Sequence, residues 1–121
     1  MGLDMYAEIT PDPVSAPVDF KVENKAEIHY WRKHPDLHGW MEQLYCAKGG
    51  TAEMFNYVNV VLTSEDLDRL EDAILGSELP ETSGFFFGQS DGSEVSDDRA
   101  FIKKAREAIT AGCTVYYTSW W

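Results

Sequence analysis

The sequence predicts an α+β fold in which one mixed or antiparallel sheet of about five strands packs against about three helices. Two observations lead to this prediction. Short segments with the period of a strand interleave with segments that have the spacing of an amphipathic helix. The first two strand-like segments also follow each other with no helix between them. The length of 121 residues fits a single domain, residues 1–121.

Five segments are expected to form strands. Residues 3–9 alternate apolar and polar side chains, and residues 26–32 form a second segment that is rich in aromatic side chains. Residues 55–62 are β-branched and aromatic. The phenylalanine run between two glycines at 84–88 predicts a short buried strand, and residues 113–120 predict the last strand.

Three segments are expected to form helices. Pro35 suits a first helical position, and the apolar spacing that follows it stops at the glycine pair 49–50. Thr63 or Ser64 can cap a second helix, which Gly76 ends.

The third helix and one connection have signals of their own. Ser96 or Asp97 can cap this helix, and Gly112 ends it. Residues 10–20 contain three prolines and are therefore expected to be an irregular connection.

The chain is strongly acidic, and the charge is unevenly placed. The formal net charge of −11 argues against nonspecific binding to nucleic acid or to an anionic membrane, because both require a basic surface. Residues 64–98 hold eleven acidic residues and one basic residue. Residues 21–48 hold five basic residues, four acidic residues and all three histidines.

The sequence also carries signals about compartment. No apolar run approaches the roughly 20 residues of a membrane helix, and the start lacks the features of a signal peptide. Two cysteines do not make a disulfide framework. We therefore expect a cytoplasmic protein without membrane or direct nucleic-acid partners, and the oligomeric state stays open.

The segment 29–40 is the first candidate for function, because it concentrates aromatic and basic side chains. Aromatic faces together with cations suit a planar anionic ligand such as a nucleotide. The alternative is that the two tryptophans are core anchors and the bases are solvated. The predicted ligand-binding residues are Tyr30, Trp31, Arg32, Lys33, His38 and Trp40, joined by Asp4 and Ser119 if the end strands are central.

The acidic stretch is the second candidate. Its carboxylates lie mostly opposite the leucines of a predicted helix, so they are either a solvated face or a surface that occupies a basic groove on a host protein. The residues of this protein-binding alternative are Glu65, Asp66, Asp68, Glu71 and Asp72.

Catalysis and metal binding have less support in the sequence. His38 could act as the base of a small hydrolase, but no nucleophile motif accompanies it. His34 and His38 are four residues apart, yet Pro35 places His34 outside the helix and spoils the geometry of a metal site. We therefore lean against an enzyme and expect no metal and no cofactor. Near the end of the chain, Trp120 is expected in the core or in a pocket wall, and the place of Trp121 stays open.

Several short blocks, in a fixed order, span nearly the whole chain. They are Gly2-Leu3-Asp4-Met5-Tyr6, then Tyr30-Trp31-Arg32-Lys33 with His38 and Trp40, Leu79-Pro80, Gly84-Phe85-Phe86-Phe87-Gly88, and Thr118-Ser119-Trp120. This set resembles a family of small uncharacterised proteins of tailed bacteriophages and prophages. Residues 34–36 and Thr118 depart from the family's pattern.

The resemblance implies a context and no activity. Some members carry a phosphoglycerate kinase label, but that enzyme is a two-domain protein several times larger, and no phosphate-binding motif occurs here. The resemblance implies a viral accessory protein in the cytoplasm of a host bacterium. We expect this protein to act by non-catalytic binding, either of a small anionic ligand or of a host protein.

Overall fold

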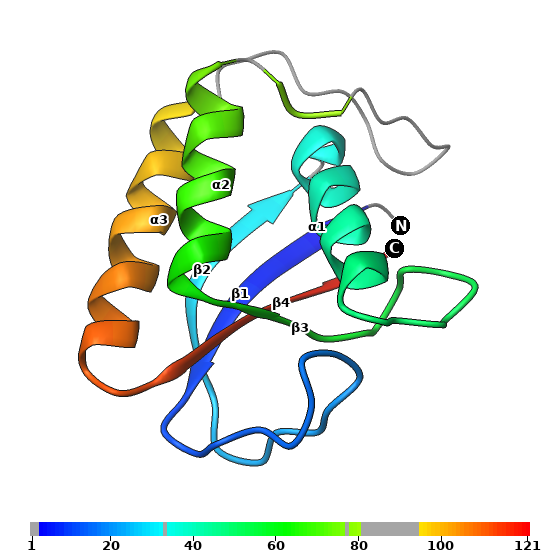
Figure 1. Cartoon of the computed structure of the whole chain (residues 1–121), viewed down its shortest axis with the longest axis vertical. Helices are drawn as coiled ribbons and strands as arrows, with labels where there is room; N and C mark the ends of the chain where they lie inside the picture. Colours follow the sequence, from blue (N-terminus) through cyan, green and yellow to red (C-terminus); the bar gives the residue numbers. More distant parts are fainter. Residues whose placement is uncertain (1–2, 33, 77, 81–94) are drawn as a thin grey trace.

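The computed structural model describes residues 3–32, 34–76, 78–80 and 95–121. Within them, four strands form one antiparallel sheet in the order β2-β1-β4-β3 (Figure 1). The strands are β1 (Asp4–Thr10), β2 (Ala26–Arg32), β3 (Val60–Leu62) and β4 (Thr114–Trp120). The two central strands therefore come from opposite ends of the chain, and they pair over their full length from Asp4 opposite Trp120 to Thr10 opposite Thr114.

The α+β class is confirmed, and of the two predicted arrangements, a mixed or an antiparallel sheet, the described strands form the antiparallel one. The described residues contain four strands rather than about five. The strand predicted at 84–88 lies outside the described residues. The strand predicted at 55–62 is reduced to β3, because Tyr57 adopts a left-handed backbone conformation with φ of 59° that a strand does not contain.

Three helices form in the three predicted segments, but the cap predicted for the third at Ser96 or Asp97 is wrong, because that helix begins at Val95 and contains both residues. The helices are α1 (Pro35–Ala47), α2 (Ser64–Leu75) and α3 (Val95–Thr110). Pro35 starts α1, and Thr63 caps α2 through a reciprocal pair of hydrogen bonds with Asp66. Gly76 ends α2 as its C-cap. None of the helices in the described ranges is long and apolar enough to cross a bilayer.

The helices cover one face of the sheet (Figure 1). Side chains alternate between the two faces along each strand, so every second residue points into the core. On the covered face, Met5, Trp31 and Tyr117 are buried together with apolar side chains of all three helices. An antiparallel sheet can leave its second face open to solvent, and this one does so in part.

The connection between β1 and β2 covers one part of the second face. Its backbone pairs with the edge of β3, where the Val61 N–H donates to the Pro17 carbonyl over 2.9 Å. Phe20 then lies against Tyr116 in an edge-to-face contact with ring centroids 5.3 Å apart. The rest of the second face holds the candidate site.

Candidate functional site

The structure divides the residues of the predicted pocket between the two faces of the sheet. Trp31 points into the core and is 3% exposed. Its neighbours in β2, Tyr30 and Arg32, are exposed on the opposite face. Asp4 lies on that open face beside them, since its carboxylate accepts a hydrogen bond from the Tyr30 hydroxyl over 2.6 Å.

The predicted residues from other elements are also dispersed. Ser119 is buried on the covered side, and Trp40 is partly buried against the core. His38 is buried in α1, and Lys33 lies outside the described residues. The seven described residues of this prediction therefore do not line one common cavity.

Trp31 belongs to a buried polar network that fastens α3 to β2. Its indole Nε1–H donates to Oδ1 of Asp98 over 2.9 Å, and Nε2 of His34 lies 2.8 Å from Oδ2 of the same carboxylate. Asp98 is only 1% exposed. A second pair, His29 with Asp97 at 3.0 Å, lies beside it. These contacts give part of the aromatic and histidine segment a structural role.

His38 is equally internal. Its Nδ1 shares a hydrogen bond of 2.7 Å with the Tyr117 hydroxyl. Burial lowers the pKa of His38 from 6.5 to about 4, and burial also raises the pKa of Tyr117 well above its usual value. His38 is therefore neutral at neutral pH and closed off from solvent, so a dissolved substrate would not reach it as a base.

The open face of the sheet presents a row of four aromatic rings. Tyr30 lies next to Tyr6, with ring centroids 5.3 Å apart, and Tyr6 lies 5.9 Å from Trp120. Trp120 in turn stacks on Tyr57, with centroids 5.4 Å apart and an angle of 26° between the rings. Tyr30, Trp120 and Tyr57 are 42%, 49% and 66% exposed. This is an unusual amount of aromatic surface in contact with water.

The register of the strands places three of the four rings, those of Tyr30, Tyr6 and Trp120, on the same face. Tyr6 lies opposite Tyr30 in β2 and opposite Thr118 in β4, so β1 carries the central ring. Trp120 lies opposite Asp4, at the end of the same pairing. The open face thus collects aromatic side chains from both ends of the chain.

Tyr57 takes its place in the row with an unfavourable backbone conformation. Its φ of 59° is uncommon for a residue with a bulky side chain and costs about 1–3 kcal/mol. Its N–H donates to the Ser119 carbonyl over 2.9 Å, which ties the loop to β4 beside Trp120. The surrounding contacts therefore hold an exposed tyrosine in a strained position.

A depression of about 430 Å³ lies at this row. Its lining combines aromatic rings, two carboxylates, one amine and small polar groups. The lining residues are Tyr6, Glu8, Val22, Lys25, Glu27, Tyr57, Asn59, Tyr116, Thr118 and Trp120. Trp120 thus forms part of a pocket wall, one of the two places expected for it, and the Trp121 indole donates to the Phe55 carbonyl over 2.8 Å.

The charges on the open face are nearly balanced, with an excess of acid. Arg32 lies 3.9 Å from the Asp4 carboxylate, and Lys25 lies 3.9 Å from the Glu8 carboxylate. Glu8 also accepts a hydrogen bond from the Tyr116 hydroxyl over 2.8 Å. Glu27 adds a further carboxylate to the lining. An anionic ligand would therefore meet no surplus of positive charge on this face.

Sequence reasoning did not single out three important residues of this face. Tyr6 and Glu8 lie on the polar side of the alternating segment 3–9, so the alternation already places them with Asp4. Tyr57 has no comparable signal, because its position depends on a tertiary hydrogen bond.

The acidic residues of the second candidate have mixed roles. Asp66 is buried, caps α2 and pairs with Lys48. Arg106 of α3 contacts two others, with Nη2 2.7 Å from Asp68 and Nη1 3.4 Å from Glu71. Three of the five carboxylates are thus already paired within the chain.

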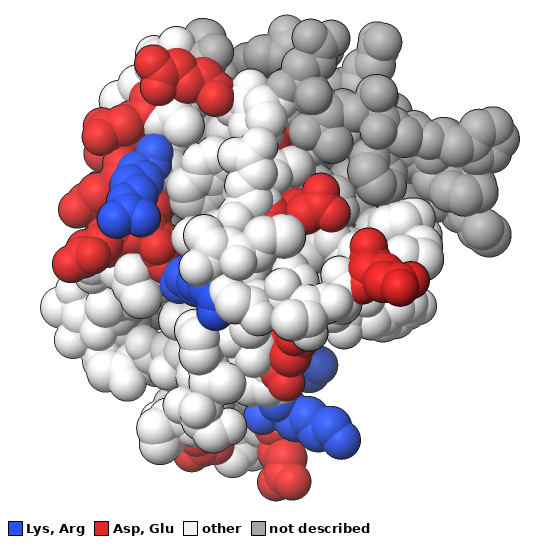
Figure 2. All heavy atoms as spheres, turned by 45° about the vertical axis from the view of Figure 1, so that its right-hand side comes forward, with Lys and Arg blue, Asp and Glu red and all other residues white. Residues whose placement is uncertain are grey.

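The remaining two carboxylates, Glu65 and Asp72, are exposed on α2. Figure 2 shows acidic side chains gathered on the flank of the molecule where this helix lies, with basic surface among them. The acidic residues of this stretch thus also lie together in the folded structure. The net charge of the flank is smaller than the number of its carboxylates, because three of the five are paired with basic side chains.

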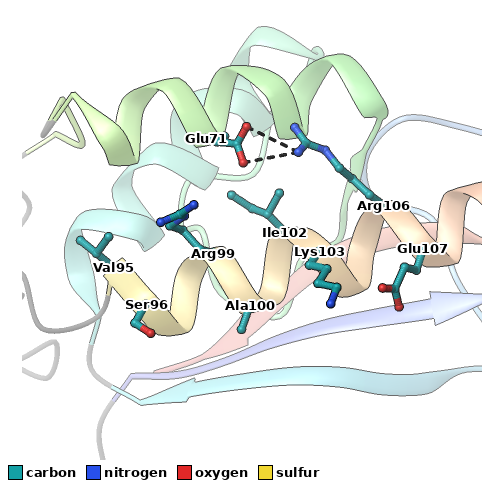
Figure 3. A pocket seen from close by; sticks show the side chains of 9 residues that line it. All are labelled: Glu71, Val95, Ser96, Arg99, Ala100, Ile102, Lys103, Arg106 and Glu107. Carbon is teal, nitrogen blue, oxygen red and sulfur yellow. Dashed lines mark hydrogen bonds and ion pairs between the residues drawn. The ribbon is translucent and has the colours of Figure 1, made fainter.

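A second, shallower hollow of about 850 Å³ lies along α3 and reaches Glu71 of α2 (Figure 3). Its charged side chains do not converge. Arg106 points toward α2, whereas Lys103 points away from it (Figure 3). The ion pair of Arg106 with Glu71 further occupies this hollow, so the open aromatic face is the stronger candidate site.

No family model, no curated protein and no solved structure matches this chain.

Proposed function

We propose that this protein acts by non-catalytic binding and that its binding site is the open aromatic face of the sheet. The observation that carries the proposal is the row of four rings beside the depression, in which Tyr30, Trp120 and Tyr57 are exposed to solvent. Exposed, contiguous aromatic surface is costly in water and is typical of binding sites. The ligand would present a flat ring or a compact apolar group to Trp120, Tyr57 and Tyr6.

This proposal keeps part of the original prediction. Tyr30, Arg32 and Asp4 belong to the same face, and the stacking of a nucleotide-like ring agrees with its aromatic surface. Trp31, His38 and Ser119 support the face from within the core instead of contacting the ligand. The role of a viral accessory protein in a host cytoplasm stays a prediction from the sequence resemblance.

The strained conformation of Tyr57 supports the proposal independently. A tyrosine in the left-handed conformation costs about 1–3 kcal/mol, which is a sizeable part of the roughly 5–15 kcal/mol by which a small domain is stable. The side chain gains little from burial in return, because it is 66% exposed. A conformation that costs stability and leaves a ring in water is understandable if that ring contacts a ligand.

The experiment is a titration with a panel of small molecules, followed by tryptophan fluorescence and by thermal stability. The panel contains neutral nucleosides, anionic nucleotides and organic cations. A binder should raise the melting temperature, because it binds only the folded state. Trp120→Ala and Tyr57→Ala should weaken binding about tenfold each, as loss of a stacking ring does.

Leu75→Ala is the matched control, because Leu75 is 58% exposed but lies on α2, away from the open face. It should leave binding unchanged. Binding that persists unweakened in both aromatic variants, or a complete absence of binding across the panel, would refute the proposed site.

The acidic flank on α2 remains a separate prediction for a protein partner. Only Glu65 and Asp72 of its five residues are exposed without an ion pair to another described residue. No observation in the described ranges favours this flank over the aromatic face.

A further inference from the structure

The depression on the open face has two chemically different sides. The rings of Tyr6, Tyr57 and Trp120 form an aromatic side, and the carboxylates of Glu8 and Glu27 lie in the same lining. Aromatic faces carry partial negative charge and attract cations, and carboxylates attract them more strongly. Both sides therefore favour the same kind of group.

We infer that the ligand of this face presents an organic cation, a substituted ammonium group such as a methylated amine, to Tyr6, Trp120, Glu8 and Glu27. This inference rests on the proposed function and names the chemical class that the site would take.

The arrangement of the rings suits a compact cation. The rings of Tyr6 and Trp120 are tilted by 55°, so they meet at an angle and do not form a flat wall. A methylated ammonium group can contact both ring faces at such an angle, as it does in an aromatic cage. A flat neutral ring uses one ring face at a time and gains nothing from the carboxylates.

The surroundings of the Tyr6 hydroxyl also indicate a negative environment. The pKa of Tyr6 is raised, first by burial and then by the charges of Asp4, Glu27 and Glu8. A negative environment disfavours the phenolate, and it stabilises a cation placed nearby for the same reason. With the chain at a net charge of −11, the long-range field has the same sign.

Lys25 is the one basic residue of the depression's lining, and it makes the inference testable. Its ammonium group lies 3.9 Å from Glu8, and its side chain is 53% exposed. A cationic ligand near Glu8 would be repelled by this lysine, whereas an anionic ligand would be attracted by it. Removing the charge of Lys25 therefore changes affinity in opposite directions for the two classes.

The experiment measures the dissociation constants of two cationic probes, choline and a peptide that contains trimethyllysine. Adenosine serves as a neutral ring and adenosine monophosphate as an anionic one. Glu27→Gln should weaken the binding of a cationic probe about threefold to tenfold, and Lys25→Met should strengthen it by a similar factor. Asp72→Asn on α2 is the matched control, because it removes the same charge as Glu27→Gln far from the face.

The outcomes separate this inference from the proposed function. Binding of choline alone would indicate a free small molecule, and binding of the peptide would indicate a modified protein partner; both support the inference. If the cations do not bind but adenosine or its monophosphate binds in a Trp120-dependent manner, the inference is overturned and the proposed function stands. A loss of cation affinity in Lys25→Met would also overturn it. If no probe binds in a Trp120-dependent manner, both proposals fail.

Discussion

The burial of His38 predicts a specific loss of stability in mild acid. His38 shares a hydrogen bond with Tyr117 inside the core, and burial lowers its pKa from 6.5 to about 4. The folded protein therefore keeps this ring neutral at pH values where the unfolded chain already protonates it. Stability from this group is fully present above pH 6.5 and is lost as the pH falls toward about 4.

The size of the effect follows from the difference between the two pKa values. At pH 5 the unfolded state gains about 2 kcal/mol from protonating this histidine, whereas the folded state gains almost nothing. His38→Gln keeps a side chain that can hydrogen-bond to Tyr117 but cannot titrate. The variant should be less stable than the wild type at pH 7, and the difference should shrink by about 2 kcal/mol at pH 5.

Urea unfolding followed by circular dichroism, at pH 7 and at pH 5, measures both free energies. Comparison with the variant cancels the contributions that the wild type and the variant have in common. If the wild type and His38→Gln lose the same stability between the two pH values, the reasoning about His38 is wrong. A titration of the His38 ring by NMR provides a direct second measurement of its pKa.

Two further predictions concern packing and the buried network. Gly50→Ala places a Cβ in steric overlap with carbons of the Tyr45 ring, so we expect a destabilisation of about 1–3 kcal/mol, visible as a lower melting temperature. A melting temperature equal to that of the wild type would contradict this contact. Trp31→Phe keeps a buried ring but removes the hydrogen bond to Asp98, and urea unfolding should show a loss of about 1–3 kcal/mol. An unchanged free energy of unfolding would mean that Asp98 does not depend on this donor.

Local signals predicted the helices well, because each helix end depends on its own residues. Within a helix, proline is tolerated only in the first turn, as Pro35 is in α1, and the Thr63 side chain accepts a hydrogen bond from the Asp66 N–H in the first turn of α2. The sheet was less predictable. Tyr57 interrupts the predicted third strand with a left-handed backbone conformation, and no residue type within 55–62 predicts this conformation.

The site was predicted less well, for a reason visible in β2. The concentration of aromatic and basic side chains at 29–40 predicts one cluster, whereas a strand sends consecutive side chains to opposite faces. Trp31 consequently lies in the core while Tyr30 and Arg32 lie on the open face. The partner of Trp31, Asp98, is 67 positions away, and pairing over such a distance cannot be read from spacing.

The pairing of β1 with β4 has a consequence for how the molecule assembles. These two strands form the middle of the sheet, and Asp4 of β1 lies opposite Trp120 of β4. During synthesis, β1 can pair with β4 only after almost all of the described chain has left the ribosome. Closing so long a loop is entropically costly and is typical of slow, all-or-none folding. The ring of Trp120 reaches Tyr6 only when β4 is paired with β1, so the aromatic face depends on this long-range pairing.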